Sequence, residues 1–454
     1  MSVCEQPHCS SIAVLGAGVS GLSIAFMARR MGCDVLLSEM REIPPDVREI
    51  LGASDIRYES GGHTDRIFDS ERIVLGSGFP PYADIMKKIA DRGVTPLGEI
   101  DFVMPHIQGR VIGVTGSNGK TTTASLLGHL LRSSGHNAVV AGNIGRPLAD
   151  VAGEGFDFVV VELSSFQLHW VSHAKLAGAI VTNLAPDHID WHGSYDKYTA
   201  AKSRILNMAG EGGFSIVQNR DTEILKAHGG GVFTLDWTEN GGERGVTLNS
   251  DERVVKMGGR ELFRFEDVKL LGFHNMENAA MAMAALKLLG CDEASARSAL
   301  STFTPPPHRC SLVLISNGVR YVDDSKGTNI AATITAMRSI DGRKIVILGG
   351  RGKGENYAEL VQPLKDCAKS AILIGEAASE MADVLKNGDY LNYYEAGEME
   401  SAVRTAVSLA EPGDVVLLSP ACTSWDAYRN YNERGDHFAS LVLKCTQETE
   451  SAGR

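Results

Sequence analysis

The feature that most constrains this chain is the segment Gly113-Val-Thr-Gly116-Ser-Asn-Gly119-Lys120-Thr121-Thr122, which begins within the predicted strand Arg110–Val114. A strand that turns through glycines into a helix points backbone N–H groups at a phosphate, and the helix N-terminus adds partial positive charge. We predict that Gly116, Ser117, Asn118, Gly119 and Thr122 surround nucleotide phosphates, that Lys120 contacts the terminal phosphates and that the Thr121 hydroxyl binds Mg²⁺. Val114 stands where the strict pattern has glycine, so a purely structural turn is the alternative.

Acidic and histidine side chains follow two later apolar runs. Residues 158–161 lead directly into Glu162, and residues 177–182 lead toward Asp187, His188, Asp190 and His192. The carboxyl ends of parallel strands carry the ligands of such sheets, and carboxylate oxygens suit Mg²⁺. We predict Glu162 and His188 as metal ligands, with helix capping as the alternative for Glu162. The roles of Asp190 and His192 stay open.

A predicted helix at residues 194–208 has one lysine on an otherwise aromatic and aliphatic face. Tyr195, Tyr198, Lys202 and Ile205 are spaced by three and four residues and therefore share that face. Lys202 is either turned toward a functional group or extends along the surface to reach water. The spacing alone does not decide between these two interpretations.

The first part of the chain has a second glycine motif. Gly16, Gly18 and Gly21 follow the predicted strand Ser11–Leu15, and Glu39 comes after the next predicted strand. This pattern is typical of dinucleotide-binding units, in which the acid contacts a ribose. It indicates a nucleotide-like ligand and, taken alone, favours a nicotinamide-dependent oxidoreductase.

Short β-branched runs alternate with glycine turns and Ala/Leu-rich helical stretches along most of the chain, which predicts an α/β protein with parallel sheets. The length of 454 residues suggests about three domains. Residues 105–109 read as a linker, and three consecutive prolines after Thr304 make a stiff connector. We therefore expect a Rossmann-like domain at 1–108, a central P-loop ATPase-type parallel-sheet domain at 109–307 with a β-rich extension at 220–271, and a Rossmann-like domain at 308–454.

Composition excludes several classes of protein. The formal net charge of −12 argues against a protein that coats nucleic acid. The eight cysteines are dispersed without a CxxC pair, which favours reduced thiols over a disulfide framework or a zinc site. The apolar run at residues 12–28 is interrupted by glycines and no Lys or Arg precedes it, so a strand–turn–helix fits better than a signal peptide. We expect a cytoplasmic monomer that does not insert into membranes.

Motifs from about residue 12 to 438 together resemble the Mur ligases of peptidoglycan synthesis. They are the Gly113–Thr122 loop, Gly142-Asn143-Ile144-Gly145, Glu162-Leu-Ser-Ser-Phe-Gln-Leu168, Asp187-His188-x-Asp190, Ala201-Lys202-x-Arg204-Ile205, His274-Asn275-x-x-Asn278, Pro307-His308-Arg309 and Asp324-Ser-Lys-x-Thr-Asn329. The Glu-Leu-Ser-Ser-Phe-Gln-Leu and Pro-His-Arg segments point to the member that adds D-glutamate.

The resemblance implies roles for individual residues. Lys120 and Thr121 would handle ATP and Mg²⁺, Glu162 the first metal ion, and His188 with a CO₂-derived carbamate on Lys202 the second. Nucleotide contacts would come from Asn275, Asn278, Arg309 and Asp324. The UDP-N-acetylmuramoyl-L-alanine substrate would face Gly16, Gly18, Ser20, Gly21, Ser38 and Asn143. D-Glutamate would face Lys326, Thr328, Lys353, Ser424 and Tyr431, where tyrosine stands in place of the family's usual phenylalanine.

The activity that the resemblance implies is ATP-dependent amide-bond formation between UDP-N-acetylmuramoyl-L-alanine and D-glutamate through an acyl phosphate. Lys120, His188 and Lys202 would carry the catalysis. Three alternatives remain: a nicotinamide oxidoreductase, a P-loop nucleotide switch, and another amide ligase such as a sister Mur ligase or a folylpolyglutamate synthetase. The D configuration of the glutamate rests on the resemblance alone.

Overall fold

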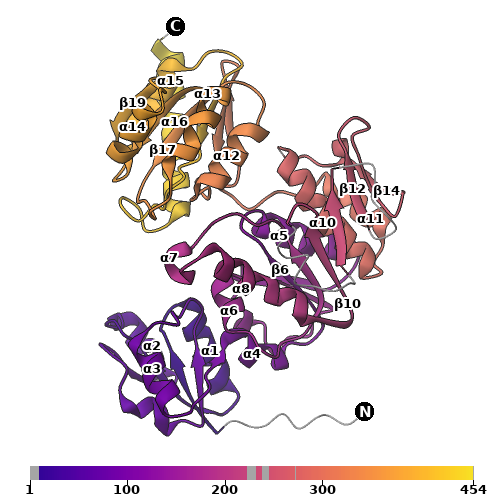
Figure 1. Ribbon diagram of the computed structural model, residues 1–454, viewed down its shortest axis with the longest axis vertical. Helices are drawn as coiled ribbons and strands as arrows, with labels where there is room; N and C mark the ends of the chain where they lie inside the picture. Colours follow the sequence, from indigo (N-terminus) through magenta and orange to yellow (C-terminus); the bar gives the residue numbers. More distant parts are fainter. Residues whose placement is uncertain (1–9, 222–231, 238–244, 271, 453–454) are drawn as a thin grey trace. The chain divides into compact units, whose positions relative to one another are not determined.

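The computed structural model describes residues 10–221, 232–237, 245–270 and 272–452 (Figure 1). The described residues form two compact units. The first contains those of residues 1–184, 191–267 and 278–302, and the second those of 185–190, 268–277 and 303–454. Two β-sheets lie in the first unit and one in the second. The predicted α/β class with mostly parallel sheets is confirmed, whereas the domain boundaries at 108 and 307 stay predictions.

The first sheet has the strand order β3-β2-β1-β4-β5, and all its pairs are parallel. Its strands are β1 (Ser11–Leu15), β2 (Asp34–Ser38), β3 (Arg57–Glu59), β4 (Arg72–Leu75) and β5 (Leu97–Gly98). The helices between them are α1 (Val19–Arg30), α2 (Pro45–Ala53) and α3 (Asp84–Asp91), and α4 (Glu99–Val103) follows β5 and lies beside α1 (Figure 1).

The second sheet has the order β14-β13-β12-β11-β10-β9-β6-β8-β7, antiparallel only among β12, β13 and β14. Its strands are β6 (Arg110–Thr115), β7 (Ala138–Gly142), β8 (Phe158–Glu162), β9 (Leu176–Val181), β10 (Ala209–Gln218), β11 (Val232–Asp236), β12 (Gly245–Asn249), β13 (Val254–Met257) and β14 (Arg260–Arg264). The associated helices are α5 (Lys120–Ser133), α6 (Ser165–His169), α7 (Ile189–His192), α8 (Tyr195–Met208), α10 (Phe273–Leu288) and α11 (Glu293–Leu300).

The third sheet has the order β15-β16-β20-β17-β18-β19, and only β15 and β16 are antiparallel. Its strands are β15 (Ser311–Ser316), β16 (Val319–Asp323), β17 (Lys344–Gly349), β18 (Ala368–Ile374), β19 (Tyr393–Gly397) and β20 (Val415–Leu418). The helices are α12 (Ile330–Ser339), α13 (Val361–Cys367), α14 (Ala378–Asn387), α15 (Met399–Leu409) and α16 (Tyr431–Ala452).

Alternating strand residues supply separate apolar cores on the two faces of each sheet. In β17, Val346 and Leu348 pack with α12, α13 and α14, whereas Ile345 and Ile347 pack with α15 and α16. In β1, Ile12 and Val14 belong to a cluster that also contains residues of β8 and β9. One continuous apolar cluster therefore joins the first and second sheets, which explains why both belong to one compact unit.

Polar contacts also attach the first sheet to the second. Asp101, in α4, accepts the backbone N–H groups of residues 172, 173 and 174 at 2.6–2.9 Å. Gln167 Nε2 donates to Glu99 Oε2 at 3.0 Å, and Gln167 also forms the capping box of α6 with Ser164. The indole N–H of Trp170 donates to the Phe79 carbonyl at 3.0 Å. These bonds fix the loop that follows Glu162 against the first sheet.

The structure adds strands that the sequence patterns did not predict. β15 and β16 form a hairpin whose turn residues, Asn317 and Gly318, have φ values of +51° and +76°. Asn-Gly is the usual signal for such a turn, so this hairpin was detectable from sequence. The predicted β-rich extension at 220–271 contains β11 to β14, but its residues 222–231, 238–244 and 271 lie outside the described residues.

Among the described residues, no helix is both long and apolar enough to cross a membrane.

Candidate functional site

The glycine-rich loop joins β6 to α5, as the sequence predicts. Gly116 and Gly119 have φ values of +142° and +79°, which side-chain-bearing residues rarely adopt. A Cβ at Gly116 would lie 2.0 Å from Thr182 Oγ1, and one at Gly119 would lie 2.4 Å from Asn278 Oδ1. Both positions therefore require glycine. Asn278, predicted as a nucleotide contact, lies directly against this loop.

Lys120 starts α5, and its side chain lies over the loop. Its Nζ donates to the carbonyl oxygens of Gly116 and Ser117 at 2.9 and 2.7 Å. The loop is held from the other side by Asn183, which follows β9: its Oδ1 accepts the Asn118 N–H, and its Nδ2 donates to the Asn118 carbonyl, both at 3.0 Å. We did not predict Asn183, although its place directly after a strand end was a usable signal.

The two residues predicted for the first metal ion are in contact. Thr121 Oγ1 donates to Glu162 Oε2 at 2.7 Å, and Asn143 Nδ2 donates to Glu162 Oε1 at 2.9 Å. Glu162 is almost fully buried, with 1% exposure. Both donors are neutral, so neither balances its negative charge. A buried carboxylate next to a hydroxyl, at the edge of a phosphate loop, provides the hard oxygen donors that Mg²⁺ prefers.

Lys202 lies against the phosphate loop on the buried face of α8. It is only 2% exposed, and its Nζ donates to the Gly116 carbonyl at 2.7 Å. Lys120 donates to the same oxygen, so two lysine amines share one acceptor. The structure thus decides between the two interpretations of Lys202, which is turned inward. Tyr198, one turn earlier, faces the Lys202 Nζ at 4.8 Å from its ring centre.

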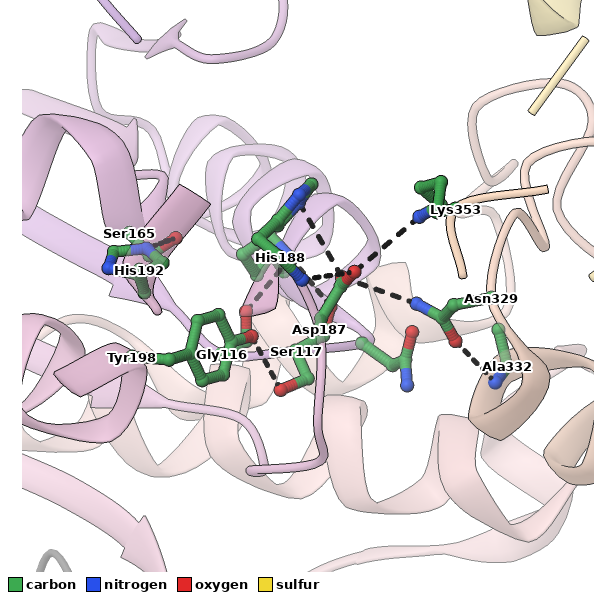
Figure 2. Close-up of polar contacts among 12 residues, drawn as sticks. Gly116, Ser117, Ser165, Asp187, His188, His192, Tyr198, Asn329, Ala332 and Lys353 are labelled. Carbon is green, nitrogen blue, oxygen red and sulfur yellow. Dashed lines mark hydrogen bonds and ion pairs between the residues drawn. The ribbon is translucent and has the colours of Figure 1, made fainter. Parts of the chain in front are cut away.

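Tyr198 also contacts the loop through its hydroxyl, which lies 2.7 Å from Ser117 Oγ (Figure 2). His192 packs edge-on against the Tyr198 ring, and its Nε2 lies 3.0 Å from Ser165 Oγ. The sequence placed Tyr198 on the correct face of α8 but did not predict this contact with Ser117.

A pocket of about 780 Å³ lies over the first glycine motif. Five of the predicted substrate residues line it, together with Arg41 and Glu39; they are Gly16, Gly18, Ser20, Gly21 and Asn143. Asn143 therefore lies at both this pocket and Glu162. Arg41 and the N-terminus of α1 provide positive potential at this pocket.

Ser38, also predicted to face the substrate, is fully buried and is not among the residues that line this pocket. Its hydroxyl donates to Glu59 Oε1 at 2.6 Å and lies 2.7 Å from His63 Nδ1.

Glu39 Oε2 accepts the Ala17 N–H at 2.6 Å, and Oε1 accepts the Arg41 N–H at 3.0 Å. Glu39 thus stabilises its own loop, whereas a dinucleotide-binding unit uses this acid for a ribose.

Two residues predicted to contact the nucleotide, Arg309 and Asp324, lie in the second unit. The Asp324 carboxylate accepts the Ser419 hydroxyl at 2.7 Å and the Cys310 N–H at 3.3 Å. Burial raises the pKa of Asp324 to about 7, although the Ser419 hydroxyl and the positive charge of Arg309 act in the opposite direction. Asn275, also in the second unit, is 7% exposed.

Most residues predicted to receive D-glutamate lie on loops tied together by one arginine. Arg434 is 1% exposed and donates to Ser325 Oγ and to the carbonyl oxygens of Ser325 and Cys422 at 2.8–3.1 Å. These loops contain Lys326, Thr328 and Ser424, and Lys326 Nζ lies 3.8 Å from the centre of the Tyr431 ring. The sequence did not single out Arg434, which sits on the helix that Tyr431 begins.

Lys353 and His188 both lie beside Asp187. Lys353 Nζ is 3.5 Å from Asp187 Oδ1, and Asn329 Nδ2 donates to Asp187 Oδ2 at 3.4 Å (Figure 2). His188 has a φ of +52°, and its Nε2 lies 3.6 Å from Asp187 Oδ2. His188 belongs to the second unit and Lys202 to the first, so their shared metal site stays a prediction.

Family models match most of the chain. They are the MurD N-terminal domain at residues 11–85, the Mur ligase middle domain at 114–286, and the glutamate ligase domain of Mur ligases at 308–422.

Curated relatives match over nearly the full length. The UDP-N-acetylmuramoylalanine–D-glutamate ligase of Desulfitobacterium hafniense (strain Y51) is 35% identical over 97% of this chain and 99% of its own. The corresponding ligase of Elusimicrobium minutum is 36% identical over 94% of this chain and 96% of its own.

Among solved structures, the UDP-N-acetylmuramate–alanine ligase MurC of Thermotoga maritima has a TM-score of 0.61 at 18% identity, covering 97% of this chain and 99% of that one. MurF of Acinetobacter baumannii has a TM-score of 0.60 at 17% identity, with 96% and 90% covered. At such identities, these two structures show a shared fold.

The close approach of Gly119 to Asn278 makes a first prediction. Gly119→Ala should abolish detectable ATP binding in calorimetric titration, because the added Cβ displaces the Asn278 side chain and strains the loop. Gly135→Ala is the matched control: Gly135 has a φ of +86° and nothing within 4 Å of its Cβ position. It should lose about 1–2 kcal/mol of stability through backbone strain but keep ATP binding. Equal ATP affinity in both variants would contradict this assignment.

The raised pKa of Asp324 makes a second prediction. Between the ordinary aspartate pKa of about 3.9 and the folded value of about 7, the unfolded carboxyl loses its proton while the folded one keeps it. Wild-type stability should therefore fall as pH rises through this window, and the loss should be complete above it. The asparagine in Asp324→Asn does not titrate. The free energy of unfolding of this variant, relative to that of wild type, should therefore rise by up to about 4 kcal/mol between pH 4 and pH 8.

Denaturant midpoints measured at several pH values test this expectation. Asp341→Asn, at an exposed position of the same unit, controls for the removal of one negative charge. A stability difference between Asp324→Asn and wild type that stays constant with pH would show that the carboxyl does not titrate in this window.

Proposed function

Because the chain belongs to the Mur ligase family, we propose that it is the ATP-dependent ligase that joins D-glutamate to UDP-N-acetylmuramoyl-L-alanine in peptidoglycan precursor synthesis. The match of its first domain to the MurD N-terminal model and its near full-length relatives of that name support this assignment. The structural observation that carries it is the phosphate loop, with Thr121 bonded to the buried Glu162, in the same unit as the glycine-lined pocket.

We assign ATP to the loop between β6 and α5. The backbone N–H groups of residues 116–122 and the Lys120 ammonium would hold its phosphates, with further nucleotide contacts from Asn275, Asn278, Arg309 and Asp324. Thr121 and Glu162 would hold one Mg²⁺, and His188 with Lys202 a second. Bound Mg²⁺ would neutralise negative charge on the phosphates during transfer. The position of the Lys120 ammonium over the loop, where it contacts two loop carbonyls, supports its placement at the site of transfer, and phosphate oxygens would replace these carbonyls when ATP binds.

We place UDP-N-acetylmuramoyl-L-alanine in the pocket over Gly16, Gly18, Ser20 and Gly21. Its size, the α1 N-terminus and Arg41 support a nucleoside diphosphate there. Asn143 lines this pocket and bonds to Glu162, so it would place the alanine carboxylate near the metal ion. Ser38 would act indirectly, because its contacts with Glu59 and His63 shape the wall of the pocket.

The proposed reaction has two steps. An oxygen of the alanine carboxylate attacks the γ-phosphorus of ATP, the bond to the bridging oxygen breaks, and ADP leaves with that electron pair. The ammonium group of D-glutamate loses one proton, the resulting amine nitrogen attacks the acyl carbon and loses a second proton, and phosphate departs. The contribution of this chain is to hold the reactants in line and to balance negative charge, chiefly through Lys120.

We assign the D-glutamate carboxylates to Lys326, Thr328, Lys353, Ser424 and Tyr431. Two anionic groups require several positive or hydrogen-bonding donors, and the loops tied by Arg434 provide them. Tyr431 would act mainly through its ring, which packs on the Lys326 ammonium.

We propose a carbamate on Lys202, which the electrostatics of the site favours. Two ammonium groups on the Gly116 carbonyl repel each other in a buried site. Addition of CO₂ to the neutral Lys202 amine, with loss of one proton, gives an anion that attracts Lys120 and serves as an oxygen ligand. This supports the carbamate over a bare amine in the active enzyme.

We further propose three domains at 1–108, 109–307 and 308–454, one for each substrate. We propose a cytoplasmic monomer that binds neither nucleic acid nor membrane. The dispersed cysteines, which form no disulfide within the described part of the chain, support a reducing compartment. The engagement of Glu39 by its own loop counts against the alternative of a nicotinamide oxidoreductase.

A phosphate-release screen tests the proposed activity. With ATP, Mg²⁺ and UDP-N-acetylmuramoyl-L-alanine, release should occur with D-glutamate but not with L-glutamate, L-lysine or meso-diaminopimelate. Release without any amino acid would indicate a nucleotide switch, and release with meso-diaminopimelate a sister ligase.

The carbamate is tested by ¹³C NMR with labelled bicarbonate. A carbamate resonance should appear in the wild type, persist in Lys197→Ala and vanish in Lys202→Ala. Lys197 is an exposed lysine of the same helix and provides the matched control. An active, Mg²⁺-loaded wild-type enzyme without this resonance would refute the carbamate.

A further inference from the structure

Asp187 has a carboxylate whose surroundings the assigned roles do not explain. Its side chain is 10% exposed, in the segment before α7 that belongs to the second unit. Oδ1 accepts the His188 N–H at 3.0 Å and lies 3.5 Å from Lys353 Nζ, while Oδ2 accepts Asn329 Nδ2 at 3.4 Å (Figure 2). Lys353, which we assign to a carboxylate of D-glutamate, is thus already paired with a carboxylate of the protein.

The groups that contact the Asp187 carboxylate differ in their freedom to move. Asn329 is the N-cap of α12: its Oδ1 accepts the Ala332 N–H at 2.8 Å, which directs its Nδ2 toward Asp187. The His188 N–H belongs to the backbone. Lys353 has a flexible side chain between two glycines, and Gly354, at φ +72°, has nothing within 4 Å of its Cβ position. Asp187 is therefore held in place without Lys353, and Lys353 is the exchangeable partner.

The charges around Lys353 favour the entry of a second cation. Glu355 Oε1 lies 3.7 Å from Lys353 Nζ, and Glu355 Oε2 accepts the Ile330 N–H at the start of α12. Burial raises the pKa of Glu355, and the negative charge of Asp187 adds to that rise. One ammonium thus faces two carboxylates, and these three groups together carry one net negative charge. An amino acid brings both an ammonium and carboxylates, which match Asp187 and Lys353 respectively.

We propose that Asp187 binds the ammonium group of the amino-acid substrate in exchange for Lys353, which turns to one of the substrate carboxylates. The zwitterion enters an existing ion pair, so Asp187 and Lys353 each exchange one charged partner for another. This inference rests on the proposed function. Contacts to two carboxylates alone do not define chirality, and the ammonium contact supplies the third point that distinguishes D- from L-glutamate.

Glutarate, which has both carboxylates and lacks the amine, is the probe for this exchange. In the wild type it should inhibit weakly, because it would separate Lys353 from Asp187 without supplying an ammonium group in its place. Asp187→Asn keeps the shape of the side chain and removes its charge. This variant should bind D-glutamate about tenfold or more weakly and glutarate more tightly, so the ratio of glutarate Ki to D-glutamate KM should fall by about 10- to 100-fold. The preference for D- over L-glutamate should fall with it.

Glu355→Gln is the matched control, because it also removes a carboxylate near Lys353. Its ratio should stay within about threefold of wild type, since Glu355 contacts Lys353 and α12 rather than the substrate amine. Where a variant is too slow to assay, calorimetry with D-glutamate and glutarate, in the presence of UDP-N-acetylmuramoyl-L-alanine and a non-hydrolysable ATP analogue, gives the same ratio.

The outcomes separate this inference from the proposed function. Phosphate release by the wild type, dependent on both D-glutamate and the UDP-sugar, establishes the function independently, and its absence would refute both. With that activity present, an Asp187→Asn variant that weakens D-glutamate and glutarate by the same factor has a structural defect, and the exchange is refuted. An equal fall of the ratio in Glu355→Gln would also refute it, because general charge would then be the cause.

Discussion

The carbonyl oxygen of Gly116 accepts hydrogen bonds from both Lys120 and Lys202, and the nucleotide site that we propose is organised around this contact. It brings the first residue of α5 and the buried face of α8 to one turn of the loop. The loop can lie this close to Thr182 because Gly116 has no side chain. A Cβ at Gly116 would collide with the Thr182 hydroxyl oxygen. Two positive groups on one buried oxygen are favoured by anions nearby, and in the proposed function the phosphates of ATP would supply them.

The site is continuous with the pocket over the first sheet. Asn143 lines that pocket and donates to Glu162, which in turn accepts the Thr121 hydroxyl of α5. Residues of the first two sheets both line the pocket, so its shape depends on how these sheets are joined. The shared apolar cluster and the bonds of Asp101 and Gln167 provide that junction.

In the second unit, acidic side chains hold the lysine assigned to an anionic substrate. Lys353 lies between Asp187 and Glu355, and both acids are themselves anchored at the start of α12, directly or through Asn329. This arrangement lets a chain with a formal net charge of −12 keep a lysine at the site that we propose for an anionic substrate. A cation held by carboxylates is kept near its site, and an incoming carboxylate can replace its partner.

The amino-acid sequence determined the features that depend on neighbouring residues. The strands β1, β4 and β6, the loop that ends at Lys120 and the buried face of α8 are all readable from apolar spacing and glycines. The Asn317-Gly318 pair also indicates a hairpin turn, and we did not predict the β15–β16 hairpin that it connects. β10 was harder to predict, because three glycines within Ala209–Gln218 weaken any strand pattern.

Only the tertiary structure decided which of these features meet. Thr121 contacts Glu162 because β8 pairs with β6 although β7 lies between them in sequence. Lys202 turns inward because α8 packs on β9, and the same spacing would equally suit a lysine that reaches water. Ser38 is buried rather than exposed to the pocket, and Asp187 is paired with Lys353 from far along the chain. Local patterns specify helices, strands and turns, whereas contacts between distant residues depend on strand order and packing, which short-range patterns do not encode.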